Sequence, residues 1–151
     1  MSINEDIRQP KFESEHHKMI INILFSADWI DQKIKTVLDL HSLTNIQYNI
    51  LRILKGAGDV PMNATDIQAV MISQKSDMTR LIDRLVKKGL ADRVVCPENR
   101  RKVNISITAA GKTILEKVHP QIKGITTQYF ESKVSIEEAQ LLSDLLDKIR
   151  Q

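Results

Sequence analysis

The chain has 151 residues, of which 42% are hydrophobic and 27% charged, with 22 Lys and Arg residues against 19 Asp and Glu residues. This composition is typical of a globular protein with one core and excludes two large domains, and no apolar run reaches the roughly 18 to 20 residues of a membrane-spanning helix. The single cysteine excludes an intramolecular disulfide, and the N-terminus lacks the basic and then apolar pattern of a secretory signal, so we expect a cytoplasmic protein.

The first predicted element is a long amphipathic helix within residues 12–43. Its main apolar stripe has spacings of three and four and comprises Ile20, Ile23, Leu24, Ala27, Ile30, Ile34, Val37 and Leu38. A second apolar row on the same helix comprises Ile21, Phe25 and Trp29. Two rows imply burial on two sides, against the helix's own domain and against another chain.

Capping signals predict two shorter helices next. The segment Thr44 to Gln47 has the pattern of a capping box and opens a helix that Gly56 ends. Asn63 is expected to cap a short helix that extends through Met71.

A further helix is expected from Ser73 onward, with Gly89 as its stop signal. One face is apolar and carries Met78, Leu81, Ile82 and Leu85. The opposite face is polar and carries Ser76, Arg80, Asp83 and Lys87. Two short helices in succession, the second with a basic outer face, are typical of a helix-turn-helix.

The pattern then changes from helical to alternating. Residues 93–96 and 102–108 are predicted strands, and residues 97–99 have turn chemistry, so the segment is a β-hairpin. Arg100, Arg101 and Lys102 lie at or just after its tip, where they can reach outward. A helix-turn-helix followed by a basic hairpin is a winged helix.

The C-terminal third returns to helical spacing. The apolar stripe from Ile114 to Tyr129 predicts a helix that Pro120 should kink or split. Ser135 to Glu138 is a second capping box and opens a last helix. The predicted fold class is therefore mainly α with a small β-hairpin wing.

The net charge is concentrated in the middle of the chain. Residues 64–107 hold nine basic and five acidic residues, which accounts for the whole formal charge of +3. A surface that binds a polyanion and an ordinary solvated charged face both fit this charge distribution.

The order of these motifs resembles the multiple-antibiotic-resistance regulator (MarR) family of bacterial transcription factors. The resemblance runs from about Leu43 to Gly111 and rests on Leu43-Thr44, Gln47-Tyr48, Leu51, the run from Met78 to Leu85, Lys88-Gly89-Leu90, Arg93, Arg100-Arg101, Ile107-Thr108 and Gly111. It implies one domain over residues 1–151, with a winged helix at 44–108 and dimerisation helices at 12–43 and 109–151. It also implies a homodimer that binds a palindromic operator in double-stranded DNA, and repression that a small-molecule effector or an oxidant relieves.

The chemistry of the basic face agrees with DNA binding. Side chains near the start of a recognition helix reach the base edges of the major groove, which we assign to Ser76, Thr79 and Arg80. Lys75, Arg84 and Lys87 are assigned to phosphates, with a structural ion pair of Arg84 to Asp83, Asp92 or the wing as the alternative.

The resemblance places Arg101 in the minor groove, steadied by an acidic residue two positions earlier. This chain has Asn99 there, which lacks the charge-assisted part of that hydrogen bond unless Glu98 substitutes for it. Arg100 and Lys102 complete the predicted DNA-binding set.

Three further sites are candidates. The cationic neighbours of Cys96 are compatible with an oxidant sensor, but an inert cysteine in the hairpin is the preferred interpretation, because the oxidant-sensing members of the family carry their reactive cysteine on the first helix. The resemblance places an effector near Phe25, Trp29, His41 and Tyr48, although such residues at helical spacing also fit a core. We expect no cofactor, and no metal at the four histidines, which are better explained as solvated or hydrogen-bonded groups.

Two other classes of function were weighed. An enzyme is not expected, because the chain has no zinc-protease, nucleophile-elbow, dinucleotide-binding or P-loop motif. A winged helix can also act as a protein-docking module. DNA binding predicts a strong dependence on salt, with a slope near −7 for about eight neutralised phosphates, and docking does not. The sequence thus predicts a ligand-responsive repressor, with a docking module or a transcriptional activator as alternatives.

Overall fold

The computed structural model describes residues 2–72, 77–96 and 99–151, with the backbone alone at 96 and 99–102. Its elements in chain order are α1 (Ile3–Asp6), α2 (Glu15–Asp39), α3 (Asn45–Gly56), α4 (Ala64–Ala69), α5 (Met78–Lys87), β1 (Ala91–Cys96), β2 (Asn99–Ile107), α6 (Ala109–Lys123), the π-helix η1 (Gly124–Gln128), α7 (Tyr129–Glu131) and α8 (Ile136–Ile149). The predicted fold class, mainly helical with a β-hairpin wing, is confirmed.

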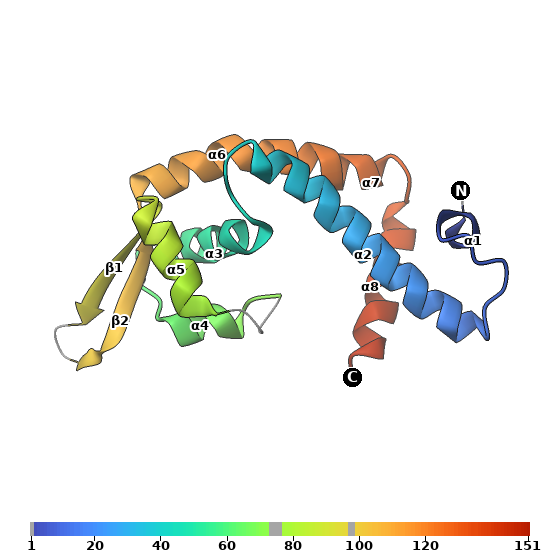
Figure 1. The fold of residues 1–151 in the computed structure, drawn as a ribbon, viewed down its shortest axis with the longest axis horizontal. Helices are drawn as coiled ribbons and strands as arrows, with labels where there is room; N and C mark the ends of the chain where they lie inside the picture. Colours follow the sequence, from blue (N-terminus) through green and yellow to red (C-terminus); the bar gives the residue numbers. More distant parts are fainter. Residues whose placement is uncertain (1, 73–76, 97–98) are drawn as a thin grey trace.

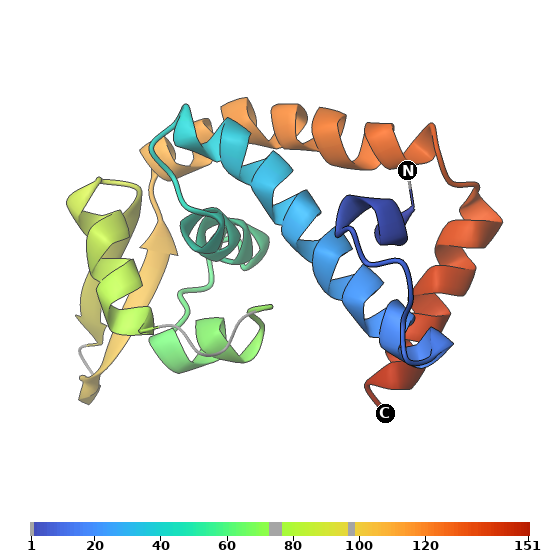
Figure 2. The same cartoon turned by 45° about the vertical axis from the view of Figure 1, so that its right-hand side comes forward.

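The elements divide into two groups in space (Figure 1). The helices α3, α4 and α5 gather beside the hairpin, and α6 leads from the hairpin toward α7. At the other end α2 and α8 form the sides of a V in the view of Figure 2, and α1 lies near the N-terminal part of α2 in both views. No helix of the described residues is long and apolar enough to cross a membrane.

The predicted caps form as hydrogen bonds. The Thr44 hydroxyl accepts the N–H of Gln47 and the Thr44 N–H donates to Gln47 Oε1, both at 3.2 Å. Asn63 Oδ1 accepts the N–H of Asp66 at 2.9 Å, and Ser135 caps α8 through Glu138 in the same reciprocal way as Thr44. Each cap satisfies N–H groups that the first helical turn leaves without a partner.

Several predicted boundaries were wrong, among them the starts of the two strands, which lie at Ala91 and Asn99 and not at residues 93 and 102. The expected helix start at Ser73 lies outside the described residues; α5 runs from Met78, where the carboxylate of Asp77 accepts the N–H of Arg80 at 3.1 Å and caps it. The short helix before it ends at Ala69, so Met71 lies beyond it. Thr108, assigned to a strand, is instead the N-cap of α6 and accepts the N–H of Gly111 at 3.0 Å.

Pro120 was expected to kink or split its helix, and the split does not occur. The α6 helix continues through Pro120 to Lys123, and the π-helix η1 follows from Gly124. The change of helical period therefore lies after the proline.

The core lies between α3, α5, α6, the hairpin and the end of α2. Its fully buried side chains are Leu38, Ile50, Leu51, Leu54, Ile67, Leu85, Ile105 and Val118. Large apolar side chains of α8 and of the first half of α2 remain exposed, among them Ile20, Leu24, Leu142, Leu145 and Ile149. The molecule thus buries the half that contains α3, α5 and the hairpin well and leaves α2 and α8 with an apolar surface.

The wing is an antiparallel hairpin whose inner rungs are regular. Ala91 pairs with Ile107 and Arg93 with Ile105, and β2 gains a further partner through hydrogen bonds between Ile105 and Met62 of 2.8 and 3.0 Å. The register shifts between Val95 and Cys96, so that residues 100–102 stand between two rungs on one strand only. This bulge lies at the tip of the wing.

The close approach of α6 to the end of α5 depends on Gly111. A Cβ atom at this position would lie 2.2 Å from the carbonyl oxygen of Leu90 and 2.7 Å from Cγ1 of Ile107. Only glycine fits without a movement of the backbone.

We predict that Gly111→Ala lowers the free energy of unfolding by about 1–3 kcal/mol, because the added methyl group meets a backbone atom. Urea denaturation at a fixed protein concentration measures it. Gly56→Ala is the control, since a Cβ there has nothing within 4 Å and the position is helical, so the variant should be as stable as the natural chain or more so. Equal stability of the two variants would contradict the prediction.

Candidate nucleic-acid interface

The helix α5 is anchored by one face and exposes the other. Met78, Ile82 and Leu85 are buried at helical spacing in the core. The opposite face is exposed and presents Thr79, Arg80, Asp83, Arg84 and Lys87. Strong amphipathicity therefore fixes which side chains reach a partner.

The cations of this face are largely unpaired. Asp83 forms an ion pair with Arg93 of β1, with Oδ1 and Nη1 2.6 Å apart. It does not pair with Arg84, nor does Asp92. Within the described ranges, the side chains of Arg80, Arg84 and Lys87 form no hydrogen bond or ion pair. Their charge is therefore available for an external anion.

The predicted contacts at the two edges of this face fall partly outside the description. Lys75 and Ser76 lie outside the described residues. The backbone places Arg100, Arg101 and Lys102 in the bulge of β2, next to the hairpin tip, and their side chains are not described. The side chains of Cys96 and Asn99 are not described either, and Glu98 lies outside the described residues. The role of Cys96 as an oxidant sensor and the steadying of Arg101 therefore stay predictions.

A cleft of about 440 Å³ runs between α4, α5 and the wing. Thr79 and Arg93 line it together with Asn63, Asp66 and Val103. The helices α4 and α5 and the hairpin thus frame one surface.

The residues predicted to surround an effector fall into separate neighbourhoods of the protomer. Phe25 and Trp29 line a cavity of about 730 Å³ between α1, α2 and α7, where the Trp29 ring lies 5.5 Å from that of Tyr129. The hydroxyl of Tyr48 lies 3.0 Å from Nδ1 of His119, and Nε2 of His41 lies 3.4 Å from the Gln121 amide nitrogen. Among the described residues no group of three could hold a metal ion.

A second cavity, of about 240 Å³, lies between the long helix and the helix-turn-helix. We call it the α2–α3 cavity; it is lined by Asp31 and Ile34 of α2, by Tyr48 and Arg52 of α3, and by neighbours that include Met71 and Ile72. The sequence indicated Tyr48 here and missed the others. The apolar Ile72, which lies beyond α4, is 95% exposed, a property that the sequence pattern does not show.

Comparison with known proteins identifies the family of the chain. The MarR family model matches residues 43–103, and the transcriptional regulator YsmB of Bacillus subtilis is 32% identical over 103 residues, covering 68% of this chain and 69% of YsmB. The chain belongs to the MarR family. The multiple antibiotic resistance protein MarR of Escherichia coli is 25% identical over 119 residues, covering 79% of this chain and 81% of that protein.

Solved structures of MarR proteins share the fold. A MarR transcription factor from Planctomyces limnophilus is 26% identical with a TM-score of 0.69, covering 93% of this chain and 98% of that one. A variant of Escherichia coli MarR in complex with operator DNA has a TM-score of 0.79 at 23% identity, covering 92% of this chain and 98% of that one. A Bordetella bronchiseptica regulator has a TM-score of 0.74 at 21% identity, covering 85% of this chain and 90% of that one. The DNA binding of that regulator is regulated by 6-hydroxynicotinic acid.

In this MarR-family chain Tyr48 links α3 to α6. Burial raises the pKa of the Tyr48 hydroxyl above its usual value of 10.0, and the nearby Arg52 partly opposes this shift. The folded state therefore holds the phenolic proton more strongly than the unfolded chain.

We predict that the free energy of unfolding decreases as the pH rises above about 10, because the unfolded chain ionises Tyr48 first. Thermal unfolding measured between pH 8 and 11 tests this. Tyr48→Phe should show a smaller decrease than the natural chain, whereas Tyr129→Phe, the other tyrosine, should keep it. An equal decrease in both variants would show that Tyr48 does not contribute.

Proposed function

We propose that this MarR-family regulator is a ligand-responsive repressor that binds a palindromic operator as a homodimer in the cytoplasm, and that it is not an enzyme. The observation that carries the proposal is the exposed face of α5, where Arg80, Arg84 and Lys87 have no counter-ion among the described residues. Such a face fits the phosphates and base edges of duplex DNA.

The contacts divide by the position of each side chain. Thr79 and Arg80 occupy the first turn of α5 and are assigned to base edges, together with Ser76. Arg84, Lys87 and Lys75 are assigned to phosphates, which set the register of the helix in the groove. The wing supplies Arg101 to the adjacent minor groove, flanked by Arg100 and Lys102.

The apolar V supports the dimer. Ile20 is 51% exposed, Leu24 62% and Leu142 55%, a pattern that one protomer alone leaves in water. We assign residues 12–43 and 109–151 to dimerisation and residues 44–108 to DNA binding. Two recognition helices then reach half-sites about one helical turn apart, roughly 34 Å.

We assign the effector to the α2–α3 cavity, with Tyr48 and Arg52 as its polar groups. The cavity lies between the proposed dimerisation helix and the DNA-binding elements, so a ligand there contacts both. Its volume of about 240 Å³ lies below the roughly 300–1,000 Å³ of typical ligand pockets, so it suits only a small ligand.

Selection of bound sequences from random duplex DNA at near-physiological salt tests the function. We expect a palindrome with two equal half-sites to emerge. Enrichment without symmetry would contradict the dimer, and no enrichment with little dependence on salt would favour the docking module.

We predict that Arg80→Ala and Arg101→Ala each weaken operator binding by about 1–3 kcal/mol, because each removes a groove contact. Lys87→Ala should instead weaken binding to all sequences alike and reduce the slope of log affinity against log salt by about one. Titration of labelled duplex measures all three. Lys55→Ala is the control, since Lys55 is an exposed cation of α3 outside the assigned contacts; an effect equal to that of Arg80→Ala would contradict the assignment.

A further inference from the structure

The ammonium group of Lys88 joins three elements of the fold. Lys88 is the C-cap of α5, directly after its last residue. Its Nζ donates to the carbonyl oxygen of Ser42 and to Oε1 of Gln47, and the Nζ–Oε1 distance is 3.3 Å. Ser42 lies in the turn after α2, and Gln47 lies in the first turn of α3. One side chain therefore links the end of the recognition helix to the connection between α2 and α3.

Both acceptors are held in place by their own surroundings. Gln47 is only 3% exposed, and its Oε1 also accepts the N–H of Thr44 in the capping box. Ser42 has a φ of 54°, a left-handed conformation that residues other than glycine seldom adopt unless neighbouring bonds fix the turn. The N–H of Leu43 closes that turn on the carbonyl of Leu38 at 3.0 Å.

The start of the Lys88 side chain is equally fixed. Gly89 follows with a φ of 68° and donates its N–H to Val86 at 2.8 Å, which closes the end of α5. The carbonyl of Gly89 accepts the hydroxyl of Thr108, the cap of α6, at 2.7 Å. Because the backbone at Lys88 and both acceptors are fixed, the ammonium group holds the end of α5 at a defined place relative to the turn after α2.

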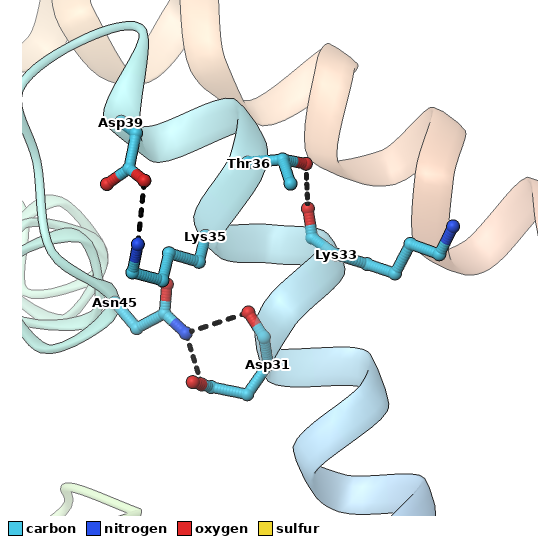
Figure 3. Close-up of polar contacts among 6 residues, drawn as sticks. All are labelled: Asp31, Lys33, Lys35, Thr36, Asp39 and Asn45. Atoms are coloured by element: carbon cyan, nitrogen blue, oxygen red, sulfur yellow. Dashed lines mark hydrogen bonds and ion pairs between the residues drawn. The ribbon is translucent and has the colours of Figure 1, made fainter. Parts of the chain in front are cut away.

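Another polar contact at this connection serves different elements. The amide of Asn45 donates to the carbonyl oxygen of Asp31, at 3.3 Å, and to its carboxylate, and so ties α2 to α3 (Figure 3). Asp39, at the end of α2, pairs with Lys35 of the same helix (Figure 3). Among the hydrogen bonds of the described residues, only those of Lys88 connect α5 to this turn.

We propose that Lys88 is a positioning residue that sets the orientation of α5 relative to α2. The inference rests on the proposed function, because α2 belongs to the proposed dimer interface and α5 enters the operator. If one ammonium fixes the angle between them in each protomer, it fixes the separation of the two recognition helices in the dimer. Lys88 then governs which half-site spacing the dimer accepts, without touching DNA.

The test measures binding of the full-length protein to duplexes whose half-sites have the selected spacing or one shifted by one or two base pairs. The natural chain should prefer one spacing. Lys88→Met keeps the apolar stem and removes the donor, and it should reduce this preference about threefold to tenfold, the net value of an ordinary hydrogen bond at a partly exposed site. Lys88→Arg, which can still donate to both acceptors, should restore it.

Lys87→Met is the matched control from the adjacent position. It should lower affinity for every spacing alike and reduce the salt slope by about one, as loss of a phosphate contact does. Lys88→Met should leave the salt slope unchanged. Unaltered spacing preference in folded Lys88→Met, or the same signature as Lys87→Met, would overturn the proposal.

Two measurements keep the inference testable if the first variant or the parent function fails. Should Lys88→Met not fold, as judged by circular dichroism, Lys88→Gln shortens the donor and should give a smaller loss of preference in the same assay. Should the natural chain show no preferred spacing, the proposed function fails, and hydrogen exchange without DNA still tests Lys88. Faster exchange of the Leu43 and Leu90 amide protons in Lys88→Met, but not in Lys88→Arg, would support the link. Unchanged exchange of these protons in Lys88→Met would overturn it.

Discussion

The arrangement depends on the packing of one short amphipathic helix. Ile82 and Leu85 of α5 are almost completely buried among side chains of α3 and the hairpin, so the helix has a single stable orientation about its axis. Rotation would place apolar groups in water and arginines in the core, and burying an unpaired charge costs far more than most single contacts contribute. The same apolar face that stabilises the domain therefore determines which cations face outward.

The caps, the main stripes and the hairpin could be predicted from sequence because each rests on local chemistry. Thr44 and Gln47 form their reciprocal bonds within one helical turn, and the alternation from Val103 to Ile107 describes a strand whatever surrounds it. The errors share a different cause. Asp77 and Thr108 each fit two neighbouring elements by propensity, and only the hydrogen bond that forms decides between them.

The candidate site was predictable to the extent that it lies on one helix. Thr79, Arg80, Arg84 and Lys87 follow from helical spacing alone. The Lys88 contacts join residues more than 40 positions apart, and the α2–α3 cavity joins residues of α2, of α3 and of the segment after α4. Periodicity carries no information about such pairs. The need for glycine at position 111 likewise depends on Leu90, which comes close only once α6 is in place.

The bridge between Met62 and Ile105 has a consequence for solubility. It covers part of the outer edge of β2, so a second molecule cannot extend the sheet there by adding a strand. Among the described residues no strand pairs with the outer edge of β1, which carries the exposed Val94 and Val95, but Asp92 and Arg93 precede them and place charge on that strand. Charged residues on an open edge disfavour strand-to-strand aggregation, which lets a small wing project from the molecule without becoming a template for self-association.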